Sequence, residues 1–120
     1  MRVFVNRWAE RSGLSGDETF RACLVATEAV TNAMRHGRVE DGVERPITLS
    51  CRIDGLELIV EVTDCGRFRT ERERVDDHGG RGLFLIREMT RSFDLRAGRE
   101  GTHLTMRLGA VERELAGAAA

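Results

Sequence analysis

Glutamate, asparagine and histidine recur at intervals of four residues, at Glu28, Asn32 and His36, within a segment whose pattern predicts a helix. On a helix this spacing puts the three side chains on one stripe. A carboxylate can accept a proton, and an amide oxygen can bind a hard cation such as Mg²⁺. The stripe therefore has the groups for base chemistry beside a metal ion. Taken alone, such a stripe is more often the solvated face of an amphipathic helix.

Two glycine-containing segments downstream add to this stripe. Asp64-Cys65-Gly66 ends a predicted strand, and the alternation of that strand turns Asp64 to the same side as its apolar residues. An inward carboxylate can accept from an exocyclic amine such as that of adenine, and glycine lets a flat ring approach the backbone. Gly79-Gly80-Arg81-Gly82 precedes a predicted helix, where exposed N–H groups and the helix N-terminus attract phosphate. Each segment could also be an ordinary turn, but together they indicate a nucleotide site.

The hydrophobic pattern predicts a two-layer α+β sandwich that positions these residues, with helices on one face of an antiparallel or mixed sheet. It predicts helices over 2–12, about 17–36 and about 80–89, and strands near 47–53, 56–64, 93–97 and 102–108. A domain over 1–110 and a tail over 111–120 are expected. Segment 65–80 has no apolar periodicity, so we interpret it as a mobile lid or, equally, a solvated loop.

Helical spacing also predicts which side chains pack. In the first helix we expect Phe4, Val5 and Trp8 to point inward. In the long helix, a separate and mostly apolar face is expected to pack; it consists of Phe20, Cys23, Leu24, Thr27, Val30, Thr31 and Met34. Ser15 followed by Glu18 is a capping-box signal for the start of this helix.

Composition limits the classes of function. The 120 residues suit one domain, and the net charge of −1 argues against a protein that coats nucleic acid. All 19 basic residues are arginine, which excludes chemistry that needs a lysine nucleophile. Three cysteines without CxxC spacing argue against a zinc site or a disulfide framework, and reduced thiols suit the cytosol. No apolar run is long enough for a membrane span.

In this order the motifs resemble those of the GHKL ATPase superfamily, which includes gyrase B, MutL and sensor histidine kinases. Within it the chain is most similar to small bacterial anti-sigma factor serine kinases of the RsbW and SpoIIAB type. The resemblance covers roughly 3–108. It consists of the N box (28–33, with His36-Gly37), the adenine-binding G1 box (Asp64-x-Gly66), the phosphate-binding G2 box (80–86) and a late Gly-Thr pair (Gly101-Thr102).

This resemblance implies the GHKL, or Bergerat, ATP-binding fold with ATP and Mg²⁺ as cofactors. It implies that Glu28 is the general base, that Asn32 holds Mg²⁺, and that Asp64 binds the adenine amine. The remaining nucleotide contacts that it implies are Gly66, Gly80, Arg81, Gly82, Leu83 and Thr102. For His36 an interaction with the helix dipole is at least as good an interpretation.

The resemblance also implies a function. The chain would be an ATP-dependent serine/threonine protein kinase that acts as an anti-sigma factor. It would sequester a sigma factor and phosphorylate an anti-anti-sigma STAS-domain protein. A cytoplasmic homodimer is implied, with no direct contact to nucleic acid or membrane.

Two departures keep alternatives open. Phe68 stands where the family often has a second glycine, and the chain begins in a helix where the family usually has a strand. A catalytically silent, ATP-responsive binding module is therefore the alternative, although the presence of both Glu28 and Asn32 favours catalysis. The ATPase domain of a histidine kinase is disfavoured, because no dimerisation helix with a phosphoacceptor histidine precedes it.

Overall fold

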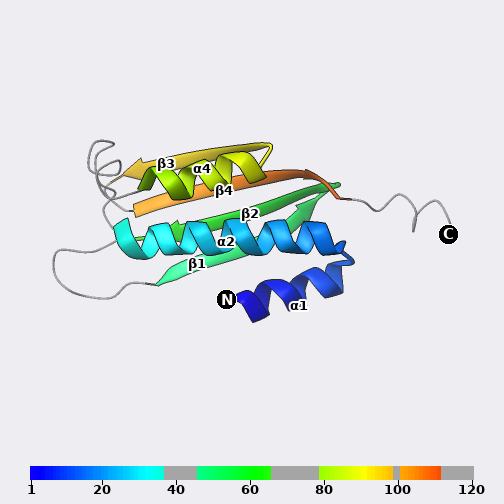
Figure 1. Cartoon of the computed structure of the whole chain (residues 1–120). Coiled ribbons are helices and arrows are strands. Elements are labelled where there is room, and N and C mark those ends of the chain that lie inside the picture. Colours follow the sequence, from blue (N-terminus) through cyan, green and yellow to red (C-terminus); the bar gives the residue numbers. More distant parts are fainter. Residues whose placement is uncertain (37–45, 66–78, 99–100, 112–120) are drawn as a thin grey trace.

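A computed structural model describes residues 1–36, 46–65, 79–98 and 101–111 of the chain. Among these residues, helices lie on one face of a four-stranded sheet (Figure 1), which confirms the predicted two-layer α+β class. The helices are α1 (Arg2–Ser12), α2 (Gly16–His36) and α4 (Gly79–Met89). The strands are β1 (Ile47–Asp54), β2 (Glu57–Asp64), β3 (Ser92–Gly98) and β4 (Gly101–Ala110). None of the described helices has the length and apolar character that a membrane span requires.

The sheet has the order β1-β2-β4-β3, and every pair of neighbouring strands is antiparallel. Strands β2 and β4 therefore occupy the centre, although they lie far apart in the sequence. The β1–β2 hairpin turns at Gly55 and Leu56, because Asp54 still pairs with Glu57. The predicted turn was Asp54-Gly55, one residue earlier. Leu56, the first residue of the predicted second strand, is exposed in the turn.

The start of α2 carries the predicted capping box. The backbone N–H of Ser15 donates to Glu18 Oε1 at 2.7 Å, and the N–H of Glu18 donates to Ser15 Oγ at 3.1 Å. These reciprocal bonds satisfy N–H groups that the first turn of a helix leaves without a partner.

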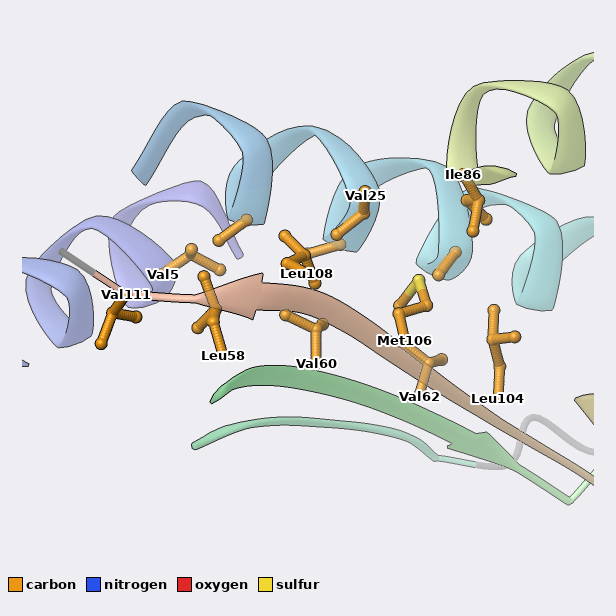
Figure 2. Close-up of a cluster of buried hydrophobic side chains, with 13 residues drawn as sticks. Val5, Val25, Leu58, Val60, Val62, Ile86, Leu104, Met106, Leu108 and Val111 are labelled. Atoms are coloured by element: carbon orange, nitrogen blue, oxygen red, sulfur yellow. The ribbon is translucent and has the colours of Figure 1, made fainter. Parts of the chain in front are cut away.

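One hydrophobic core fills the space between the helices and the sheet (Figure 2). Cross-strand pairs build its floor, since Val60 lies opposite Met106 and Val62 opposite Leu104 in the β2–β4 register. Val111, the first residue of the predicted tail, is buried at one end of this core. The buried members are Val5, Ala22, Val25, Ala26, Ala29, Leu58, Val60, Val62, Ile86, Leu104, Met106, Leu108 and Val111.

The packing face predicted for the long helix is wrong in part. Cys23 and Val30 of that face pack against the core, but only partly buried, and the fully buried residues of α2 are small, namely Ala22, Val25, Ala26 and Ala29. Phe20 and Met34, at the two ends of the predicted face, are 63% and 66% exposed. Small side chains let α2 approach the sheet closely, and this close approach turns the larger apolar residues to the flank.

The inward residues of α1 are also only partly as predicted. Val5 is fully buried and Trp8 is partly buried, but Phe4 is half exposed. Ala9 takes a buried place instead. As in α2, an alanine rather than an aromatic residue makes the closest contact.

We expect the partly buried thiol of Cys51 to make the protein less stable at alkaline pH. Burial, with a smaller effect from Cys23, raises the pKa of Cys51 from 9.0 to about 11. The unfolded chain therefore loses its thiol proton first, and stability that is present below pH 9 is lost between pH 9 and 11. The expected loss is about 1–2 kcal/mol after allowing for partial exposure.

Urea unfolding of the protein and of Cys51→Val at pH 8 and 10.5 checks this. The chain has no tyrosine and no lysine, so few other groups titrate in this interval. The urea midpoint of Cys51→Val is expected to change less between the two pH values. An equal change in both proteins would remove Cys51 as the cause.

Candidate functional site

Four element ends meet at one end of the domain. Figure 1 shows the last turn of α2, the end of β2, the start of β4 and the first turn of α4 together, at the left of the view. The three segments that carry the predicted chemistry are thus brought to one place. The antiparallel pairing of β2 with β4 is what sets the carboxyl end of one strand beside the amino end of the other.

A buried polar pair lies at this end of the sheet. Asp64 is the last residue of β2, and Thr102 lies opposite it on β4. Both residues face the helices, with exposed fractions of 7% and 8%, as the alternation predicted. The Thr102 hydroxyl donates a hydrogen bond to Asp64 Oδ2. Because burying a carboxylate is costly, this arrangement holds an acceptor in place beneath the surface.

Gly101 approaches the backbone next to this pair so closely that no side chain fits. A methyl group added there would lie 1.9 Å from the carbonyl oxygen of Asp64. Its φ of +134° is also one that residues with side chains rarely adopt. Gly101 therefore brings Thr102 against Asp64. The predicted strand began only near 102, so the Gly-Thr pair was the only feature of the sequence that indicated this contact.

Glu28 and Asn32 lie, partly buried, on the flank of α2 that borders α4. The opposite flank of α2 lines a groove with α1 through residues such as Cys23 and Thr27. Since Figure 1 shows α1 and α4 on opposite sides of α2, helical spacing puts the Glu28–Asn32 stripe on the α4 side. Glu28 is one turn before Asn32, and Asn32 is one turn nearer the end that holds Asp64.

The first turn of α4 presents a helix N-terminus to the same end of the domain. The helix begins at Gly79, so Gly80, Arg81 and Gly82 lie within its first turn, and no acidic residue is among them. The positive end of the helix dipole therefore has no carboxylate of its own turn to neutralise it. Leu83 is partly buried against the core, which fixes the rotation of the helix.

Several predicted residues lie outside what the structure describes. Gly66, Phe68 and most of the predicted lid fall in 66–78, and Gly37 falls in 37–45. For His36 and Arg81 only the helical backbone is described. Their predicted roles stay predictions.

The residues at this site suit a metal ion that is held mainly by a bound small molecule and only to a lesser extent by the protein. Among the described residues, no group of three histidine, cysteine, aspartate or glutamate side chains could hold an ion by itself. Asn32 offers one amide oxygen. Mg²⁺ commonly takes one or two protein ligands and completes its shell with phosphate oxygens and water. The site therefore fits Mg²⁺ that arrives with a nucleotide.

Comparison with known families gives one match over most of the chain. Residues 1–108 match the model of the histidine kinase-like ATPase domain. This match includes every residue of the candidate site. No curated protein matches the chain significantly.

Several solved structures share the fold. The blue-light activated histidine kinase of Erythrobacter litoralis EL346 superposes with a TM-score of 0.67 at 20% identity, over 86% of this chain and 33% of that one. A histidine kinase domain of the same protein superposes with a TM-score of 0.63 at 21% identity, over 82% of this chain and 46% of that one. The Acinetobacter baumannii histidine kinase AdeS superposes with a TM-score of 0.56 at 11% identity, over 78% of this chain and 47% of that one. The chain thus spans less than half the length of each of these structures.

Proposed function

Because the chain belongs to the family of histidine kinase-like ATPase domains, we propose that it binds ATP and transfers its terminal phosphoryl group to a serine or threonine of a partner protein. The observation that carries this proposal is the buried Asp64–Thr102 pair, set at the same end of the domain as the Glu28–Asn32 flank and the start of α4. Such a reaction needs three parts. They are a hydrogen-bond acceptor for the adenine ring, a flank with a carboxylate and an amide, and a helix end that attracts anions.

The adenine end is proposed to lie against Asp64. Its carboxylate accepts a hydrogen bond from the exocyclic amine, and Thr102 holds that carboxylate in orientation. Gly66 lets the ring approach the backbone. The close contact of Gly101 with Asp64 keeps both strands in the register that this requires.

The phosphate end is proposed to lie between α2 and the start of α4. Backbone N–H groups of Gly80, Gly82 and Leu83 attract the phosphates, and Arg81 adds a guanidinium. Asn32 would hold Mg²⁺ against the phosphates. The bound ion would neutralise part of the negative charge of these phosphates.

Glu28 is the proposed base. It accepts the hydroxyl proton of the substrate as the hydroxyl oxygen forms its bond to the γ-phosphorus. The bond between that phosphorus and the β–γ bridging oxygen breaks, and ADP leaves. The protein's main contribution is to position the nucleophile, and a well-placed base adds to it.

The proposed biological role is that of a cytoplasmic anti-sigma factor that works as a homodimer. It would hold a sigma factor and phosphorylate an anti-anti-sigma STAS-domain protein. Support comes from the set of motifs, which is most similar to serine kinases of the RsbW and SpoIIAB type. The three solved structures described above are histidine kinases, so the chemistry of the product decides between serine and histidine.

Incubation with γ-labelled ATP and candidate STAS-domain proteins tests this role. We expect label on the STAS-domain protein that survives acid and is lost in alkali, as phosphoserine requires. Acid-labile label would indicate phosphohistidine instead. No label with the true partner, while ATP binds, would favour the catalytically silent module.

Asp64→Asn is expected to weaken ATP and ADP binding by about 1–3 kcal/mol. The substitution replaces one acceptor oxygen with a donor, which then faces the donating amine of adenine. Isothermal titration measures the loss. Asp94→Asn is the matched control, because Asp94 is an exposed aspartate on the other face of the sheet. Affinity equal to that of the wild type in Asp64→Asn would place adenine elsewhere.

A further inference from the structure

The sheet face that carries no helix is lined with polar and charged side chains on β3 and β4. Along both strands the inward apolar residues alternate with outward ones. Figure 1 shows the labelled helices on the opposite side of the sheet. The outward residues are Ser92, Asp94, Arg96, His103, Thr105 and Arg107, and we call this surface the open face.

On the open face Glu57 and Glu61 of β2 are more buried than the side chains that bind them. Glu57 is bound by Arg91 and by Arg107, whose Nη1 is 3.1 Å from Oε1. Glu61 is bound by His103, with 2.6 Å between Nε2 and Oε2. The side chains of Glu57 and Glu61 are only 18% and 16% exposed, whereas their partners are 42–63% exposed. At these two glutamates an approaching partner therefore meets guanidinium or imidazole groups first, whereas Asp94, with its side chain 64% exposed, is itself accessible.

Side chains of the open face surround a hollow of about 270 Å³ between β3 and β4. Arg96, His103 and Arg107 line it, together with the hydroxyls of Ser92 and Thr105. The only acid in its lining is Asp94, which accepts from Arg96 Nε at 2.9 Å. A guanidinium has five donor hydrogens, so one such bond leaves others available for a ligand. The hollow is thus rich in donors and suits a carboxylate.

Beside the hollow runs a strand edge. β3 is the last strand in the sheet order, so among the described strands β4 alone pairs with it. An edge strand presents backbone N–H and C=O groups to which an extended peptide can bind. Ser92, Phe93 and Asp94 of β3 line the hollow, so a peptide on this edge would have side chains within its reach.

We propose that the open face and the edge of β3 dock an extended, acidic segment of a partner protein. The segment pairs with β3 as an added strand and places a carboxylate in the hollow. A peptide is favoured over nucleic acid because the edge of β3 offers backbone groups that pair with an extended peptide. This surface lies on the face opposite the proposed nucleotide site, so the two proposals can fail separately.

The first test is titration of the full chain with a short fluorescent peptide of alternating glutamate and threonine. Arg96→Ser is expected to weaken binding about fivefold, and added salt is expected to weaken binding to the wild type. Arg21→Ser is the matched control. Both arginines make a single 2.9 Å contact to a nearby aspartate, but Arg21 lies on α2. Equal affinity in the two variants, or equal binding of a lysine–threonine peptide, would overturn the proposal.

Amide hydrogen exchange then tests the mode of binding. The peptide is expected to slow exchange in 92–98 and to leave α1 unchanged. No protection in β3 overturns strand addition. Tighter binding of a single-stranded oligonucleotide of the same charge would assign the face to nucleic acid. Protection of β3 that appears with rising protein concentration and without peptide would assign it to a second copy of the chain.

Discussion

Glu28→Gln is expected to slow phosphoryl transfer about 100- to 10,000-fold, while ATP binding stays near that of the wild type. The amide keeps the size of the side chain but cannot take the substrate proton. Since Glu28 is one helical turn further than Asn32 from the end that holds Asp64, its loss leaves the proposed adenine contacts intact. Single-turnover transfer from γ-labelled ATP measures the rate, and isothermal titration measures the binding.

Two companion variants make this result specific. Glu88→Gln changes an exposed glutamate of α4 and is expected to leave transfer unchanged. Asn32→Ala is expected to weaken Mg²⁺-dependent ATP binding as well as transfer, because it removes an oxygen ligand. Undiminished transfer by Glu28→Gln would end its assignment as the base. Equal losses of binding and transfer would make Glu28 a binding residue.

Gly101→Ala is expected to destabilise the protein by about 3 kcal/mol or more. The added methyl group would lie 1.9 Å from the carbonyl oxygen of Asp64 and 2.8 Å from the Cα of Cys65. Both obstacles are backbone atoms, which cannot rotate away as a side chain can. The start of β4 must then move from β2, and the Asp64–Thr102 contact is expected to loosen.

Gly98→Ala provides the control for Gly101. Gly98 is the register partner of Gly101, but a methyl group there meets nothing within 4 Å. We expect Gly98→Ala to change the urea midpoint little and Gly101→Ala to lower it strongly. If Gly101→Ala folds, its ATP affinity is expected to fall while that of Gly98→Ala is kept. Equal midpoints in the two variants would show that β4 does not depend on this close approach.

The sequence predicted most elements because period and alternation carry that information directly. Thr102, Leu104, Met106 and Leu108 share one parity, and all four are buried. The prediction of the packing face of α2 was wrong in part, because alanines determine which side of the helix faces the sheet. Ala22, Ala26 and Ala29 carry a weak hydrophobic signal, yet they are the residues that let the helix lie close to the sheet.

The site was predictable only in part, for a similar reason. The parity of the strand gave the inward direction of Asp64, and the structure confirms its burial. Its contact with Thr102 and the close approach of Gly101 depend on the pairing of β2 with β4, which are separated by α4 and β3. Local pattern does not specify a pairing between distant strands. On the open face, the contacts of Glu57 and Glu61 with Arg107 and His103 depend on the same register.

Calorimetric titration of the wild-type chain with ATP and with GTP, each with Mg²⁺, tests whether Asp64 forms an adenine-binding site. We expect ATP to bind at least about tenfold more tightly than GTP. Adenine offers an amine to the Asp64 carboxylate, whereas guanine has a carbonyl oxygen at that position, and two acceptors would then face each other. Equal affinity for the two nucleotides, or no binding of either, would show that Asp64 does not form an adenine site.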